Sequence, residues 1–290
     1  MIDLHTHSNR SDGTLPPGEL IEHAARAGVT AMALTDHDTC AGIAEAQSRG
    51  RELGVEVLPG IELSVSEQDG ARQMHVLGYG IDVEHPALVA ETARMDGERR
   101  ARGRRIVEQL RARGVELDYA EVEAGAQGTV GRPHVARVLV ARGFCRDSDD
   151  AFARYLRRGC AGYVPSPGFS ARAAIELIHT AGGVASLAHP PLSSGISGPG
   201  GLATFVSNLV LLGLDGLEVE HPGHSSSQRR KLRRMVRDHD LVPTGGSDFH
   251  GSNRPGIRLG RGRGDVSIGR DVYDALLARI EIQRDAVRAD

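Results

Sequence analysis

The 290-residue chain has few cysteines, no basic and apolar leader at its start, and no apolar run long enough to span a bilayer. The three cysteines, Cys40, Cys145 and Cys160, are scattered and form no Cys-x-x-Cys pair. An odd and dispersed set argues against a disulfide framework. These absences exclude a disulfide-stapled secreted protein and a membrane protein. We therefore expect a cytoplasmic protein with reduced cysteines, no membrane association and no evident protein partner.

The composition, with 40% hydrophobic and 25% charged residues, is typical of a globular protein with one large domain or one domain carrying an insertion. The net charge of −3 conceals an asymmetry, because residues 98–160 contain fourteen arginines and nine acidic residues. An acidic body with a basic segment fits a cation site that receives an anionic substrate. A solvated arginine-rich helix would give the same composition.

Short β-rich runs alternate with amphipathic segments along most of the chain. Strands are predicted at residues 1–5, 31–35, 56–61, 74–79, 184–187, 216–219 and 242–244. Helices are predicted at 17–27, 43–53, 171–181, 202–212, 226–238 and 272–288. This alternation predicts an α/β fold of βα units with a parallel sheet, and about seven strands suggest a barrel.

The alternation fails between residues 86 and 164, where apolar residues recur with helical spacing. Ile106, Val107 and Leu110, for example, form an apolar stripe on an otherwise charged segment. We expect residues 1–85 and 165–290 to form the barrel. The intervening residues 86–164 are then a helical insertion that covers one face of it.

The first candidate site residues lie in the opening sequence MIDLHTHSNRSDG. His5 and His7 are two residues apart on a predicted strand, so both side chains point to the same face. Paired neutral imidazoles are suited to chelating one divalent ion, although surface histidines would show the same spacing. Asp12 follows in a Ser-Asp-Gly turn, from which its carboxylate could return to the same end of the strand.

Further candidates follow the next strands. Asp36, His37 and Asp38 end one strand and precede a helix, so either aspartate could be a helix N-cap and leave His37 for a metal. Glu62 stands in an apolar, strand-like context where a buried carboxylate needs a partner such as a metal ion. His75 lies at the start of the following strand, and a lone histidine there is more often structural.

The last candidates are His189, at the end of a predicted strand, and Asp248 and His250, two apart just after another. Hydrophilic ligand types thus recur at most strand ends, where a βα fold places its site. Nitrogen and oxygen ligands without a thiolate suit manganese, which we favour, or zinc, iron or magnesium. Nine candidates exceed the needs of one ion, so two or three ions per chain are expected: His5, His7, Asp12, His37, Glu62, His75, His189, Asp248 and His250.

Together, the segments HTHSNRSDG, TDHD and GGSDFHG, the strand glutamate and the later histidines resemble the polymerase-and-histidinol-phosphatase (PHP) family over about residues 1–85 and 165–255. The resemblance implies a distorted (β/α)7 barrel with a trinuclear metal centre. It assigns ligands to three ions in turn: His5, His7, Glu62 and Asp248; Glu62, His75 and His189; and Asp12, His37 and His250. Several members have a histidine where this chain has Asp12, which changes the charge of that site.

Within the insertion, the segments GRPHVAR (131–137), YLRRG (155–159) and GYVP (162–165) are similar to the 3′,5′-nucleoside bisphosphate phosphatase branch. Some proteins of this branch also trim RNA from its 5′ end. This similarity implies a hydrolase that removes the 3′-phosphate of nucleotides such as adenosine 3′,5′-bisphosphate. It also implies that Arg132, His134 and Arg158 contact phosphate, although a surface arginine is an alternative interpretation of Arg158.

No side chain is expected to attack phosphorus in this scheme, since a hydroxide bridging two ions is the expected nucleophile. His221 and His224, which follow a predicted strand, and Asp36 are candidates for a proton donor or for supporting a ligand. Three alternatives remain open. They are a histidinol-phosphate-type small-molecule phosphatase, an amide or lactone hydrolase, and a non-catalytic metal-binding module.

Overall fold

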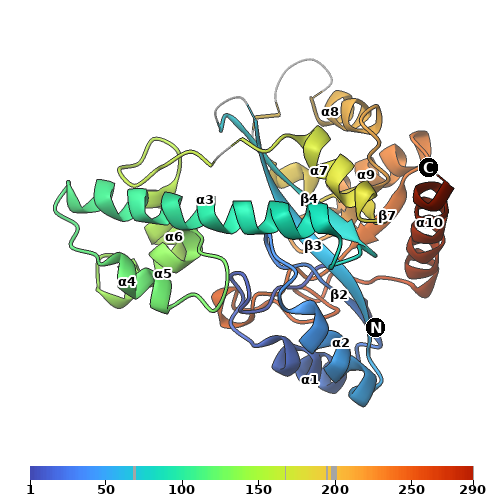
Figure 1. Ribbon diagram of the computed structural model, residues 1–290, viewed down its shortest axis with the longest axis horizontal. Coiled ribbons are helices and arrows are strands. Elements are labelled where there is room, and N and C mark those ends of the chain that lie inside the picture. Colours follow the sequence, from blue (N-terminus) through green and yellow to red (C-terminus); the bar gives the residue numbers. More distant parts are fainter. Residues whose placement is uncertain (68–69, 167, 194, 197–200, 290) are drawn as a thin grey trace.

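A single curved sheet lies at the centre of the fold (Figure 1). The computed structural model describes residues 1–67, 70–166, 168–193, 195–196 and 201–289. Within these ranges seven strands pair in the order of the sequence, and all seven lie where strands were predicted. They are β1 (Ile2–Asp3), β2 (Ala31–Leu34), β3 (Glu56–Glu67), β4 (Arg72–Tyr79), β5 (Val184–Leu187), β6 (Gly216–Glu220) and β7 (Val242–Gly245).

The predicted parallel sheet is confirmed for the other strands but not for β4, which runs antiparallel to both β3 and β5. The strand β3 continues to Glu67, well beyond its predicted end at residue 61, and only residues 68–71 separate it from β4. A parallel crossover needs a dozen or more residues, so this short connection enforces a hairpin. The reversal brings the start of β4 to the edge where the parallel strands end.

The two ends of the sheet meet beyond β1 and β7. The backbone N–H of Leu4 donates to the carbonyl of Gly245 at 3.1 Å, and that of Asp248 donates to the carbonyl of His5 at 2.9 Å. A further bond joins the His7 N–H to the Phe249 carbonyl at 3.0 Å. These bonds close the curved sheet into a distorted barrel, with the seam at the edge where the parallel strands end.

The predicted helices of the barrel are confirmed, and they cover the outside of the sheet. In β2, Ala31 and Ala33 belong to an apolar cluster shared with the C-terminal helix, whereas Met32 and Leu34 pack against the first two helices. Both faces of the strand are therefore buried, as expected for a parallel strand in a barrel. No helix in the described ranges has both the length and the apolar character that crossing a bilayer requires. The helices are α1 (Pro17–Ala27), α2 (Ile43–Leu53), α7 (Ala171–Thr180), α8 (Gly201–Val210), α9 (Ser226–Asp238) and α10 (Arg270–Ala289).

The segment between β4 and β5 is helical and has an apolar cluster of its own. Figure 1 shows its long helix α3 extending away from the sheet, with the shorter helices packed beside its far half. Ile106 and Leu110 of α3 pack with Val135 and Leu139 of α5 and with Leu156. The elements are α3 (Pro86–Arg111), α4 (Tyr119–Ala124), α5 (Arg132–Ala141), α6 (Ser148–Ala151) and a π-helical turn, η1 (Phe152–Leu156).

Candidate metal centre

The nine histidines and carboxylates singled out from the sequence converge at one edge of the barrel. Most of them follow the end of a parallel strand, and His75 joins them because β4 is reversed. Glu62, buried in β3, is the residue that most of the others approach. The structure therefore brings side chains from both halves of the chain together around Glu62.

One group of ligand atoms surrounds the Oε2 atom of Glu62. The Nε2 atoms of His5 and His7 both lie 3.2 Å from this oxygen. The same two nitrogens lie 3.5 and 3.3 Å from Oδ1 of Asp248. All four side chains are buried, so two imidazoles and two carboxylates face one another in the interior of the protein.

A second group surrounds the other oxygen of Glu62. Its Oε1 atom lies 2.9 Å from Nδ1 of His75 and 3.0 Å from Nε2 of His189, and these two nitrogens are 3.3 Å apart. The three atoms thus form a nearly equilateral triangle. Glu62 links the two groups, one oxygen to each.

A third, wider group lies around Asp12. Nε2 of His250 is 3.1 Å from Oδ1 of Asp12, and Nε2 of His37 is 3.9 Å from Oδ2. His7 and His250 stack with ring centroids 4.1 Å apart, which brings the first and third groups into contact. Nδ1 of His37 also lies 3.2 Å from Glu62.

The spacing of these atoms fits divalent ions. Two ligands about 2.1 Å from one ion lie about 2.9–3.4 Å apart in tetrahedral or octahedral geometry, close to the distances above. Among the described residues, buried nitrogens of His5, His7, His37 and His250 have no hydrogen-bond partner although carboxylate oxygens lie close by. Lone pairs that converge without hydrogen bonds are expected of groups that share a cation. These clusters are therefore suited to holding metal ions.

Hydrogen bonds behind the cluster fix which nitrogen of each ring faces inward. Nδ1 of His250 donates to the carbonyl of Asp248 at 2.8 Å, and this leaves its Nε2 unprotonated toward Asp12. Nδ1 of His5 lies 2.9 Å from Oε1 of the fully buried Glu218, so its Nε2 likewise faces the cluster as a lone pair. Such supporting partners set the tautomer of a ligating histidine.

Glu218 in β6 contacts two of the candidate ligands and was not singled out from the sequence. Its second oxygen accepts a hydrogen bond from the backbone N–H of His189 at 2.6 Å, so one carboxylate supports two candidate ligands. Burial opposes its ionisation, but the neighbouring His5 and His221 hold the pKa of Glu218 at about 2. The available signal was an acidic residue inside an apolar strand, the same signal that identified Glu62.

Asp36 and Asp38 have structural partners, and neither caps α2, whose N-cap is Gly42. The N-cap interpretation is therefore wrong. Asp36 accepts hydrogen bonds from the backbone and hydroxyl of Ser8, at 2.8 and 2.6 Å, and holds the loop that carries Asp12. Asp38 instead accepts from the Arg99 guanidinium at 2.6 Å.

His221 and His224 lie behind the cluster. The Gly223 N–H donates to Nδ1 of His221 at 2.9 Å, so its protonated Nε2 donates to Oδ2 of Asp248 at 3.1 Å. His224 donates through Nδ1 to the carbonyl of Val219 at 2.9 Å. His221 thus orients Asp248, and neither ring belongs to the pocket lining described below.

Backbone strain also marks the cluster. Asp248 and His189 have φ angles of 52° and 29°, in the left-handed region that non-glycine residues rarely adopt. Each such residue costs about 1–3 kcal/mol and persists only where its surroundings impose it. Strain at two candidate ligands is typical of a functional site.

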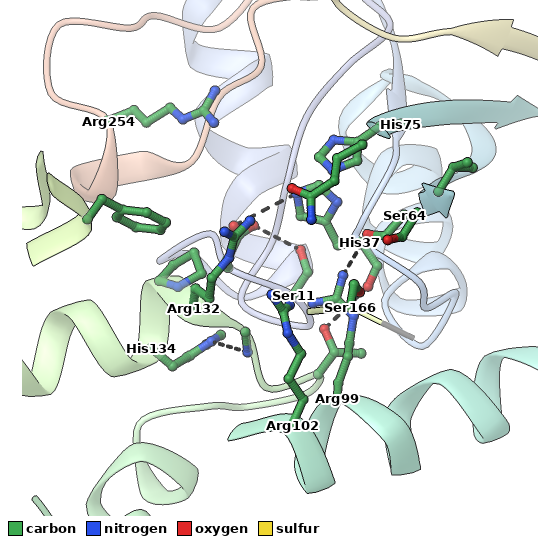
Figure 2. A pocket seen from close by; sticks show the side chains of 18 residues that line it. Ser11, His37, Ser64, His75, Arg99, Arg102, Arg132, His134, Ser166 and Arg254 are labelled. Atoms are coloured by element: carbon green, nitrogen blue, oxygen red, sulfur yellow. Dashed lines mark hydrogen bonds and ion pairs between the residues drawn. The ribbon is translucent and has the colours of Figure 1, made fainter. Parts of the chain in front are cut away.

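A pocket opens beside the cluster, between the barrel edge and the inserted helices (Figure 2). Asp12, His37 and His75 line one side of it. The structure does not bring Arg158 here, since that side chain is exposed and outside the lining. The basic side chains that do line the pocket are Arg99, Arg102, Arg132, His134 and Arg254.

Arg99, Arg102 and Arg254 were not identified from the sequence. Arg254 forms an ion pair with Oδ2 of Asp248, which places a guanidinium at the edge of the cluster of candidate ligands. Its position a few residues after the GGSDFHG segment was the only signal for it.

His134 is placed to donate a hydrogen bond into this pocket. Its Nδ1 accepts from the Gly131 N–H at 3.1 Å, so its Nε2 carries the proton. Burial and the nearby Arg137 lower the pKa of His134 to about 4, which keeps the ring neutral at pH 7. The guanidinium of Arg132 lies over the Phe152 ring, 5.6 Å from its centroid. Arg132 and His134, two of the predicted phosphate contacts, therefore both line the pocket as hydrogen-bond donors.

Comparisons with known proteins agree with this geometry. The family model of the PHP domain matches residues 3–140. A 5′-3′ exoribonuclease from Haemophilus influenzae is 38% identical over 248 residues, covering 86% of this chain and 89% of that protein. A 3′,5′-nucleoside bisphosphate phosphatase from Chromobacterium violaceum is 36% identical over 285 residues, covering 96% of this chain and 97% of that protein.

A solved structure extends the similarity to three dimensions. It is that of a candidate metal-dependent phosphoesterase from Bifidobacterium adolescentis, with a TM-score of 0.86 and 33% sequence identity. The match covers 96% of each chain, so it includes the inserted helices as well as the barrel.

Proposed function

Because this chain belongs to the PHP family of metal-dependent phosphoesterases, we propose that it removes the 3′-phosphate of 3′,5′-nucleoside bisphosphates, such as adenosine 3′,5′-bisphosphate. One observation carries the proposal. A cage of cation ligands adjoins a pocket whose basic lining includes arginines without acidic partners among the described residues. Such a pair of sites suits a substrate with two phosphates.

In this proposal two or three divalent ions occupy the cage, with manganese favoured by the mixed histidine and carboxylate ligands. Bound there, divalent ions would neutralise charge on a phosphoryl group and lower the pKa of water. The ligand sets follow the three groups of atoms: His5, His7, Glu62 and Asp248; Glu62, His75 and His189; and Asp12, His37 and His250.

The protein's own side chains then bind and orient the substrate. Arg254, beside Asp248, is placed to donate to the reacting phosphate, where negative charge grows in the transition state. Arg132 and the Nε2–H of His134 are placed to donate to the second phosphate. These donors come from the inserted helices, so we propose that residues 86–164 act as a substrate cap.

The same arrangement accommodates the 5′ end of an RNA. The phosphate on the 3′ oxygen of the first nucleotide of a 5′-phosphorylated RNA corresponds to the 3′-phosphate of a bisphosphate. Water adds to that phosphorus, the bond to the 3′ oxygen breaks, and the leaving oxygen takes a proton. The products are a 5′-mononucleotide and an RNA with a new 5′-phosphate. The names of the two relatives support both substrates.

The test compares phosphate release from four compounds by protein that has been stripped with a chelator and reloaded with Mn²⁺. They are adenosine 3′,5′-bisphosphate, 3′-AMP, 5′-AMP and histidinol phosphate. Without metal we expect no turnover. With metal, kcat/KM for the bisphosphate should exceed that for 3′-AMP by about 100-fold, the effect of one or two charge-assisted hydrogen bonds.

Equal efficiency on 3′-AMP, or a preference for histidinol phosphate, would contradict the proposed substrate. Glu62→Gln should be inactive because it removes an oxygen from the centre of the cage. Glu56→Gln, at the exposed opposite end of the same strand, is the matched control and should keep full activity.

A further inference from the structure

Arg102 of α3 lines the pocket and is 8% exposed. Its Nε donates to the carbonyl of Val164 at 2.9 Å. Its Nη2 is buried without a hydrogen-bond partner, and Arg102 forms no ion pair with any described residue. A guanidinium stays charged at neutral pH, so leaving it buried and unpaired is costly. A buried cation in this position needs an anion, and no described residue supplies one.

The neighbouring cations increase this cost. Burial, together with the charges of Arg132 and Arg99, lowers the pKa of Arg102 to about 9. Of these three arginines, Arg99 is compensated by the carboxylate of Asp38. Arg132 forms no ion pair with a described residue and instead lies over an aromatic ring. Two guanidiniums thus face the pocket without an acidic partner.

The pocket offers a further polar atom that lacks a partner. The Oγ of Ser66, on β3, is buried without a hydrogen bond and lines the same space. Figure 2 shows Arg99 and Arg102 rising from α3 into the pocket, toward Arg132 from α5. Asp12 is the only carboxylate among the described lining residues, and it belongs to the metal cluster. The remaining part of the pocket is therefore positively charged.

We propose that Arg102 is the specificity-determining residue for the non-reacting phosphate, which it binds together with Arg132 and the hydroxyl of Ser66. The identification of this ligand as the 5′-phosphate of a nucleotide rests on the proposed function. The two guanidiniums carry a charge of +2, and a terminal phosphomonoester carries about −1.5 to −2 at pH 7. A phosphodiester or a carboxylate has a single negative charge and would leave one cation uncompensated. The subsite is thus matched to a terminal phosphate.

The first test measures binding without the metal cage. Protein kept metal-free with a chelator is titrated with inorganic phosphate, and its melting temperature is compared with that in potassium chloride of equal ionic strength. Phosphate should raise the melting temperature of the wild type, because an anion that binds the native state stabilises it. The rise should disappear in Arg102→Met and persist in Arg111→Met, which removes an exposed arginine from the same helix.

The second test separates specificity from general damage. In the Mn²⁺-loaded enzyme, Arg102→Met should lower kcat/KM for adenosine 3′,5′-bisphosphate by about 10- to 100-fold, the effect of one charge-assisted interaction. Its kcat/KM for 3′-AMP, which lacks the 5′-phosphate, should stay within about twofold of the wild type on the same reasoning. Arg102→Lys keeps the charge but lacks the planar guanidinium group, so its kcat/KM for the bisphosphate should lie between those of the wild type and Arg102→Met.

Equal losses on both substrates, or a phosphate-induced rise that survives in Arg102→Met, would overturn the assignment. So would a wild type that phosphate does not stabilise. If instead the wild type binds phosphate through Arg102 but hydrolyses neither nucleotide, the subsite stands and the proposed reaction fails.

Discussion

Replacing Glu218 by glutamine tests whether a carboxylate outside the cage controls its affinity for metal. Glu218 accepts hydrogen bonds from two donors, Nδ1 of His5 and the backbone N–H of His189. Glutamine has the same shape but only one acceptor oxygen, and its NH₂ group would face a donor. The backbone N–H cannot change its polarity, so the His5 ring must adapt. Its proton would move to Nε2, the atom that faces Glu62 and Asp248.

The magnitude follows from this change of tautomer. A protonated Nε2 cannot bind a cation, so an ion bound there would have one fewer of its four proposed ligands or would have to displace the proton. Loss of a supporting group of this kind typically weakens metal binding about 10- to 100-fold. That corresponds to about 1.4–2.7 kcal/mol. Because Glu218 is fully buried, solvent cannot substitute for the missing acceptor.

The assay is a Mn²⁺ titration of metal-free protein in competition with a chromophoric chelator, repeated with activity as the readout. Glu218→Gln should need about 10- to 100-fold more Mn²⁺ for half-saturation and approach wild-type kcat at saturation. Glu220→Gln is the matched control, since Glu220 lies on the same strand but pairs with Arg229 and Arg233. Wild-type Mn²⁺ affinity in Glu218→Gln would refute the reasoning.

Two further substitutions test stability. Burial opposes ionisation of Asp38, but Arg99 holds the pKa of Asp38 below its usual value. The ion pair therefore stabilises the fold above about pH 4, and this stabilisation is lost as the pH falls through the lowered pKa. Arg99→Met should therefore lower the free energy of unfolding by about 3 kcal/mol at pH 7. In urea denaturation that loss should shrink toward pH 3, and a loss independent of pH would exclude the ion pair as its cause. Tyr79→Phe removes the 2.9 Å hydrogen bond to the buried Leu4 carbonyl and should cost about 1–3 kcal/mol; an unchanged unfolding midpoint would show that the carbonyl finds another donor.

The parallel part of the fold could be predicted because its strands have both faces buried and appear as short apolar runs. The reversal of β4 could not, because the end of β3 contains polar residues such as Ser64 and Ser66 that hide the length of the strand. The candidate ligands could be predicted because the strands that precede them are recognisable in the sequence. They follow strand ends, so their positions along the chain determine where they lie in the barrel.

The arginines of the pocket could not be predicted, because the composition of a highly charged helix does not show which of its arginines faces a site. A signal was nevertheless present. Arg102 follows Met95 by seven residues and precedes Ile106 by four, so it lies in phase with the buried face of α3. A cation in phase with an apolar stripe needs an explanation. Arg158, by contrast, was expected at the site from a motif, and the end of the π-helical turn leaves it in solvent.

The seam of the barrel has a consequence for how the protein matures. Asp248 and His250 leave the ribosome more than two hundred residues after His5 and His7. The backbone hydrogen bond between Asp248 and His5 joins these distant segments, and an ion bound by both side chains would further stabilise this contact. An unfinished chain cannot offer this complete set of ligands. Metal capture would thereby report that the chain has been synthesised beyond His250 and that the two edges of the sheet have met.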